Sequence, residues 1–120
     1  MNVLTVYCDG GLKGGEAYGS FMIKDGKTHK FKFGKKTSNE AEYLTFLKAL
    51  KHLIENETDT DIVILIDSQL VLKQVTGTWR CKNKKLNPLC TKAVLLLEKT
   101  SKDIVIGWID NKHMKRILGH

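Results

Sequence analysis

The chain has 120 residues, the size of one domain, so we expect a single domain over residues 1–120. Hydrophobic residues make up 42% of it and proline occurs once, which excludes a disordered chain and a proline-rich linker. The net charge is +7, and residues 61–120 carry eleven cations against five acids. This excess favours a polyanionic partner, most simply nucleic acid, but solvated surface lysines explain it as well.

The sequence shows no membrane span, secretory signal or disulfide framework. Its longest apolar run, Ile62–Ile66, is far shorter than the roughly 20 residues that cross a bilayer. The first residues lack the basic start and long apolar stretch of a secretory signal. The spacing of the three cysteines, Cys8, Cys81 and Cys90, indicates neither a disulfide framework nor a C-x-x-C motif. We therefore expect reduced thiols without disulfide partners in a cytoplasmic protein. Nothing in the sequence indicates an obligate dimer, so we expect a monomer.

The first 34 residues predict an antiparallel meander of three strands. Asn2–Tyr7 and Ala17–Ile23 are rich in apolar and β-branched residues, and Thr28–Phe33 alternates apolar with polar positions. Asp25-Gly26 suits the hairpin turn between the second and third strands. A flexible turn between the first two strands is expected at four glycines: Gly10, Gly11, Gly14 and Gly15.

The middle of the chain predicts a helix, a buried strand and a short helix. Thr37 and Glu40 fit a capping box, and leucines at helical spacing extend the helix to about Glu55. Asp61–Ile66 ends in a compact Ile/Val/Leu run typical of a strand buried on both faces. Ser68–Val75 is expected to be a helix that Gly77 ends.

The last third predicts one more helix and one more strand. Asn87 is expected to cap a helix with Pro88 in its first turn, running to about Lys99. Asp103–Ile109 is the last predicted strand, and no helix is expected in the eleven residues that follow. The order β-β-β-α-β-α-α-β predicts an α/β fold, with a five-stranded mixed sheet and helices packed on it.

Three acids occupy positions that suggest a shared site. Asp9 and Asp67 each follow an apolar strand, and Glu42 lies in the first turns of the predicted helix from Thr37. Each has an ordinary explanation as a turn acid, a helix cap or a first-turn acid. If the three converge, they repel one another unless a cation lies between them. Oxygen ligands select Mg²⁺ or Mn²⁺, and such a site in a basic protein suggests phosphodiester chemistry.

Several segments together resemble type 1 ribonuclease H. Val6–Gly11 is similar to the first-strand motif of that family, which ends in Asp-Gly. Thr37–Tyr43 resembles the segment that leads to the helical glutamate, and Ile66–Val71 resembles the Asp-Ser-Gln segment. Ile104–Ile109 looks like the last strand. The resemblance covers almost the whole chain, and the segments are specific only in combination and in order.

The resemblance implies an endonuclease that cuts the RNA strand of RNA–DNA hybrids and leaves 3′-hydroxyl and 5′-phosphate ends. Asp9, Glu42 and Asp67 would hold Mg²⁺ or Mn²⁺, two ions in all. Asn39 and Gln69 match positions that contact the minor groove of the hybrid, where an amide suits a 2′-hydroxyl. The other matched contact positions are Gly10 and Gly11, beside the RNA strand, and Thr37, near a DNA phosphate.

A basic segment follows the second predicted helix and contains no acid. It fits an edge that tracks the phosphates of the DNA strand, or alternatively a solvated loop with its tryptophan covering the core. Its residues are Trp79, Arg80, Lys82, Lys84 and Lys85.

The fourth acid of the family is missing. Counting from Trp108 places Leu118 at its position, and leucine binds no metal. His120 is our preferred replacement as a catalytic metal ligand, through its imidazole or a terminal carboxylate. Asp110 and His113, the latter expected in a loop, are the other candidates. A site with only three acids leaves two further interpretations open: a weak or inactive nucleic-acid-binding module, or another nuclease of the same fold.

Overall fold

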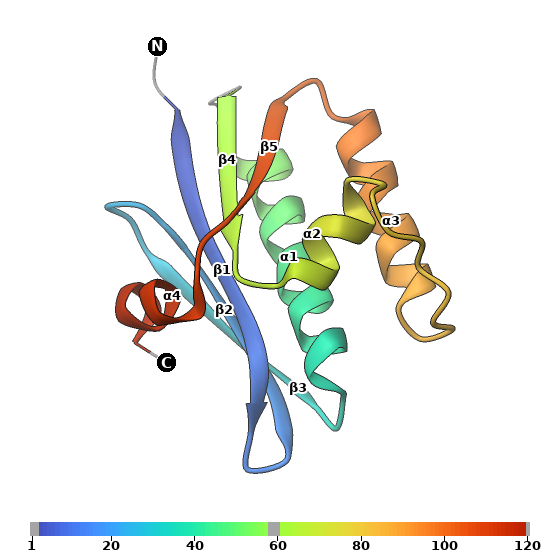
Figure 1. Ribbon diagram of the computed structural model, residues 1–120. Coiled ribbons are helices and arrows are strands. Elements are labelled where there is room, and N and C mark those ends of the chain that lie inside the picture. The colour runs from blue at the N-terminus through green and yellow to red at the C-terminus, as the bar shows by residue number, and fades with distance from the viewer. Residues whose placement is uncertain (1–2, 58–60, 120) are drawn as a thin grey trace.

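The computed structural model describes residues 3–57 and 61–119 and shows a five-stranded sheet with helices on both faces (Figure 1). The strand order across the sheet is β3-β2-β1-β4-β5. The predicted α/β fold with a mixed sheet is confirmed. The elements in chain order are β1 (Leu4–Lys13), β2 (Glu16–Ile23), β3 (Thr28–Gly34), α1 (Ser38–Asn56), β4 (Asp61–Ile66), α2 (Gln69–Val75), α3 (Asn87–Lys99), β5 (Asp103–Trp108) and α4 (Asn111–Leu118).

The central strand β1 joins the two halves of the sheet. It pairs antiparallel with β2 and parallel with β4, and β4 pairs parallel with β5. The parallel register places Cys8 opposite Ile66. Asp9 and Asp67, the next residue on each side, therefore lie next to each other at one edge of the sheet.

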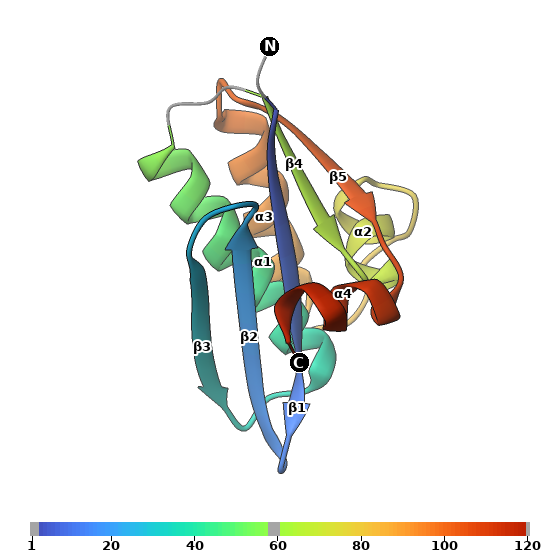
Figure 2. The same cartoon turned by 90° about the vertical axis from the view of Figure 1, so that its left-hand side faces the viewer.

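The core lies between the sheet and α1, with α2 and α3 beside α1 (Figure 1). Val6 and Cys8 of β1 are buried against it. In β4 the burial alternates: Ile62 is buried, whereas Val63 is only partly covered. The prediction of a strand buried on both faces was therefore wrong. On the opposite face, α4 packs against β1 and β2 (Figure 2).

The glycine-rich segment is mostly strand. Gly10 and Gly11 pair with β2, so β1 continues to Lys13 and only Gly14 and Gly15 make the turn. Their φ angles of 59° and 81° are the left-handed conformation that glycine tolerates. The flexible turn predicted at all four glycines was therefore too wide. Asn2, predicted to begin this strand, lies outside the described residues.

The predicted start of α1 is confirmed, whereas α2 begins one residue later than predicted and α3 lacks its predicted cap. Thr37 forms the expected capping box with Glu40, and Ser68 caps α2 by accepting a hydrogen bond from the Val71 amide. Asn87 was expected to cap α3 but is its first helical residue. Its side chain instead donates to the Cys81 carbonyl, which ties the preceding loop to the helix.

A fourth helix, α4, occupies the segment where none was predicted. Asp110 caps it by accepting a hydrogen bond from the His113 amide at 2.8 Å, so His113 lies in its first turn rather than in a loop. Gly119 ends it with a φ of 73°. Met114 and Leu118 are buried under it and fix it to the open face of the sheet. No helix within residues 3–57 and 61–119 combines the length and apolarity of a membrane span.

Candidate metal centre

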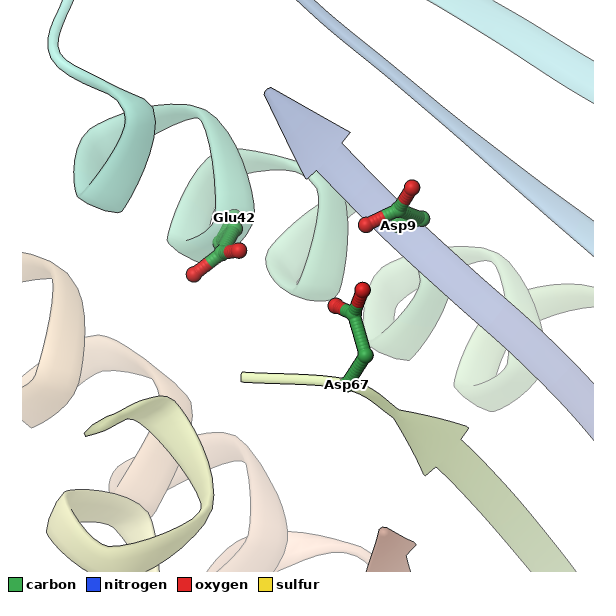
Figure 3. Close-up of side chains that lie close together, drawn as sticks. All are labelled: Asp9, Glu42 and Asp67. Atoms are coloured by element: carbon green, nitrogen blue, oxygen red, sulfur yellow. The ribbon is translucent and has the colours of Figure 1, made fainter. Parts of the chain in front are cut away.

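Three carboxylates from three elements converge at the edge of the sheet (Figure 3). Asp9 comes from β1, Glu42 from α1, and Asp67 from the residue after β4. One carboxylate oxygen of each lies within 4.8 Å of the others. The sequence analysis made this convergence conditional on the helix of Glu42 packing on the sheet near the two aspartates, and the structure meets that condition. The carboxylates can therefore share a cation.

The backbone brings α1 close enough for Glu42 to reach the aspartates. The parallel pairing of β1 with β4 ends at Cys8 and Ile66, while β1 continues beyond Asp9. At Gly10 the strand nearly touches the helix: a Cβ there would lie 2.5 Å from the Ala41 carbonyl oxygen. The sequence analysis expected a glycine here so that RNA could approach the backbone. The structure gives Gly10 a second role, because the glycine also lets α1 pack on β1.

The electrostatics of the cluster favour a bound cation. Burial raises the pKa of Glu42 to about 7; a hydrogen bond with Ser68 opposes this rise, and the charges of Asp67 and Asp9 add to it. The same two aspartates, after burial, raise the pKa of the Cys8 thiol. A divalent cation would offset this repulsion, and an all-oxygen donor set suits Mg²⁺ or Mn²⁺. The residues therefore fit the implied metal.

The junction between β5 and α4 holds Asp67 in place. The Trp108 indole Nε1 donates to the Asp67 carbonyl at 3.1 Å, and the Asn111 amide Nδ2 donates to its Oδ2 at 2.7 Å. The sequence analysis missed Asn111, because without α4 nothing places residue 111 beside residue 67. The signal available was Asp110, an N-cap residue type that directly precedes it.

Asp110 and His113, two of the candidates for a fourth ligand, do not join the cluster. Leu118 is buried under α4. Asp110 and His113 pair with each other, with 2.8 Å between Oδ2 and Nδ1. Among the residues that the structure describes, one group of three or more potential metal ligands has its ligand atoms within 4.8 Å of one another: Asp9, Glu42 and Asp67. His120, our preferred fourth ligand, lies outside the described residues, and its role stays a prediction.

Several predicted nucleic-acid contacts lie within a few residues of the three carboxylates in the sequence. Asn39 is exposed one helical turn before Glu42, and Thr37 is the cap of the same helix. Gln69 is exposed at the start of α2, two residues after Asp67. Gly11 lies two residues after Asp9 on the same strand. These positions could all touch a ligand that reaches the carboxylates, and their roles stay predictions.

The basic segment forms an exposed loop between α2 and α3. Trp79 is 49% exposed, so about half of its surface faces solvent. This exposure does not decide between the two interpretations of the loop, because a residue that caps a core also keeps one face in solvent. The loop reaches the start of α1: the backbone hydrogen bond from Thr37 lowers the pKa of Glu40, and Lys85 contributes to that shift through its charge. The remaining cations are exposed: Arg80, Lys82, Lys84 and Lys85.

Residues 1–114 match the model of the RNase H family. The chain is also 33% identical over 105 residues to the uncharacterized protein YpeP of Bacillus subtilis (strain 168), an alignment that covers 79% of this chain. It covers 46% of YpeP, so the chain spans about half the length of that relative.

Solved RNase H structures share the fold. RNase H1 of the archaeon Halobacterium salinarum is 28% identical, with a TM-score of 0.84 over 96% of this chain and 91% of that one. The N-terminal RNase H domain of rv2228c from Mycobacterium tuberculosis is 25% identical, with a TM-score of 0.83 over 97% and 88%. LC11-RNase H1, solved in complex with an RNA/DNA hybrid, is 22% identical with a TM-score of 0.82 over 94% and 89%, a likeness of fold alone. With a family match over nearly its whole length and this fold, the chain belongs to the RNase H family.

Proposed function

We propose that this protein is a metal-dependent endonuclease that hydrolyses the RNA strand of RNA–DNA hybrids. The observation that carries the proposal is the convergence of Asp9, Glu42 and Asp67 within 4.8 Å at the edge of the sheet. Membership of the RNase H family supports the reaction class. The products are expected to carry 3′-hydroxyl and 5′-phosphate ends.

In this proposal Asp9, Glu42 and Asp67 hold two Mg²⁺ or Mn²⁺ ions. When bound, such ions lower the pKa of water and offset the charge that develops on the phosphate oxygens. Asn111 fixes one oxygen of Asp67 by its hydrogen bond of 2.7 Å, which keeps that carboxylate aimed at the cluster. The proposal also includes His120 as a fourth, catalytic metal ligand.

The nucleic-acid contacts follow from the position of the exposed residues around the cluster. Asn39 and Gln69 present amides that donate to and accept from a 2′-hydroxyl, the group that distinguishes RNA from DNA. Gly10 and Gly11 lie where the strand backbone borders the carboxylates, on the proposed RNA side. The proposed contacts to the DNA strand are Thr37, Trp79, Arg80, Lys82, Lys84 and Lys85. We also propose that the protein acts in the cytoplasm as a monomer with a single domain.

A second candidate function is hybrid binding with little or no cleavage. The observation that favours it is the nature of the group beside Asp67, where Asn111 presents an amide and no fourth carboxylate joins the cluster among the described residues. Fewer anionic ligands would hold a second cation weakly. Activity would then be low or require Mn²⁺.

Cleavage of end-labelled substrates tests the proposal. RNA–DNA hybrid, RNA duplex and DNA duplex are incubated with the protein in Mg²⁺ and, separately, in Mn²⁺. We expect cutting of the RNA strand of the hybrid alone, and loss of that cutting in Asp9→Asn. Cutting of DNA duplex would instead indicate another nuclease of this fold.

Binding measurements separate the two candidate functions. Asp9→Asn keeps the shape of the side chain and removes one charge, so hybrid binding is expected to remain. A wild-type protein that binds the hybrid and leaves it intact in both metals would support the binding module. A His120→Ala protein with unchanged activity in both metals would exclude His120 as a ligand.

A further inference from the structure

The open face of the sheet carries a groove that the proposed reaction does not use. It lies over β1, β2 and β3 beside the end of α4, on the side that faces the viewer in Figure 2. Its volume is about 630 Å³. Three lysines, Lys13, Lys30 and Lys32, line it together with Tyr18 and Ser20, and no carboxylate does. The groove is therefore a positively charged surface within the folded domain.

The strand register connects this groove to the carboxylates. Asp9 pairs with Ser20, and Ser20 pairs with Lys30, so the three form one row on the open face. Neighbouring strands are ~4.8 Å apart, which puts the Lys30 backbone roughly 10 Å from that of Asp9. In the next row Tyr18 pairs with Lys32. Ser20 is buried, so a strand of nucleic acid with one phosphate at Asp9 reaches the lysines by way of the partly exposed Tyr18.

Tyr18 lies between the two sites. Burial raises the pKa of its phenol, and the charges of Asp9 and Asp67 raise it further, so the ring is within the field of the cluster. The same residue lines the groove. It is partly exposed, so an aromatic ring is available there to contact a base or a sugar. A phosphate chain leaving the carboxylates would pass Tyr18 first and then reach Lys30 and Lys32.

We propose that this groove binds the backbone of the cleaved strand on one side of the scissile phosphate, through Lys30, Lys32 and Tyr18. This inference rests on the proposed function and extends the contact surface to the face of the sheet opposite the basic loop at Arg80. Charge complementarity selects the occupant, because Lys30 and Lys32 attract phosphates and pair with uncharged residues on β2. Lys13 pairs with Glu16 and is therefore left out of the contact. A second copy of this chain carries the same net charge of +7 and would be repelled.

The salt dependence of hybrid binding tests the inference. Binding of a fluorescent RNA–DNA hybrid is measured by polarisation in EDTA over a series of salt concentrations. Each lost phosphate contact reduces the slope of log K against log salt by ~0.7–0.9. We expect a reduction of about 1.4–1.8 in Lys30→Ala/Lys32→Ala. In cleavage assays the same variant should raise KM and leave kcat at saturation unchanged.

The matched control is Lys92→Ala/Lys99→Ala, which removes the same charge from exposed positions on α3. Its slope should equal that of the wild type. Equal slopes in both double variants would overturn the proposed phosphate contacts of the groove and leave the proposed nuclease activity unaffected. A wild type that binds the hybrid without cutting it, with a reduced slope only in Lys30→Ala/Lys32→Ala, would support the groove and overturn the nuclease. A wild type that binds no hybrid would overturn both.

Discussion

Glu42 is the residue whose protonation the fold changes most clearly within the carboxylate cluster. Burial, with the charges of Asp67 and Asp9, raises its pKa from 4.5 to about 7 despite a hydrogen bond with Ser68. Between these two values the folded metal-free protein holds a proton that the unfolded chain has released. Raising the pH through this window therefore lowers the free energy of unfolding.

We expect this loss of stability to disappear in Glu42→Gln, which cannot ionise. Urea unfolding in EDTA at several pH values from 4.5 to 8 measures it. The wild type should lose stability relative to Glu42→Gln as the pH rises to about 7, and the difference should then stay constant. His29, whose pKa burial lowers, is present in both proteins and cancels. A difference independent of pH would contradict the prediction.

Asn111 gives a second prediction at the residue scale. Replacing it with aspartate places a fourth carboxylate beside Asp67, and an acid in the first turn of α4 also suits the helix dipole. A cation bound to the folded state alone raises Tm, and tighter binding raises it more. We expect Mn²⁺ to raise the Tm of Asn111→Asp more than that of the wild type in differential scanning fluorimetry. Asn111→Ala, which adds no charge, should show no such gain.

The site could be predicted from sequence as far as the local pattern reaches. Asp9 and Asp67 each follow an apolar run of the sequence, and the parallel pairing of β1 with β4 brings them together, although Asp9 itself lies inside β1. Glu42 required one further step, the placement of its helix on the sheet. Asn111 lay beyond prediction because its contact with Asp67 spans 44 positions and depends on a helix that the pattern did not indicate.

At the scale of elements, β2 and α1 pack closely because Gly19 on β2 has no side chain. A Cβ at Gly19 would lie 1.7 Å from Thr45 Oγ1, so Gly19→Ala forces the Thr45 side chain, or the helix that carries it, to move. Overpacking of this kind costs about 1–3 kcal/mol. We expect that loss in urea unfolding, and we expect Thr45→Ala to restore much of it in the double variant. Additive effects of the two substitutions would show that Thr45 is not the obstacle.

The capping box of α1 gives a prediction of smaller size. The Thr37 hydroxyl accepts a hydrogen bond from the Glu40 amide at 3.1 Å, and the Glu40 carboxylate accepts one from the Thr37 amide at 3.0 Å. Thr37→Ala should lower the free energy of unfolding by about 1 kcal/mol, the usual value for a lost cap. Ser38→Ala, at an exposed neighbouring position without a cap bond, serves as the control. An equal loss in both variants would contradict a specific capping role.

Helices and strands were predictable where one dominant pattern governed them. Thr37 and Glu40 predicted the start of α1 because the capping box is a local interaction. Gly10 and Gly11 were misassigned because glycine also occurs in strands that another element approaches closely. The start of α3 was misjudged because Asn87 bonds to Cys81, a contact made only once the loop has folded.

For the whole molecule, the sheet divides the positive charge into two surfaces that flank the carboxylates. The basic loop of residues 79–85 lies on the side of α1, and the groove of Lys30 and Lys32 lies on the side of α4. No single segment of the sequence contains both. Only the folding of the sheet places them on either side of one cluster, which is why the sequence predicted the loop alone.

The two faces of the sheet should also differ in local stability. α1 has seven buried residues along its length, whereas α4 is held by only Met114 and Leu118 among its described residues. Elements with little buried area open at lower free energy than the global unfolding reaction. We therefore expect amides of α4 to exchange with deuterium much faster than those of α1 and β1. Equal protection of α1 and α4 in the metal-free protein would show that both helices unfold only with the whole domain.

The same measurement in Mn²⁺ reports on the cluster. Because Asn111 lies on α4, each opening of this helix also releases Asp67 from its hydrogen bond. We expect Mn²⁺ at the cluster to slow exchange in β1 near Asp9 without protecting the end of α4.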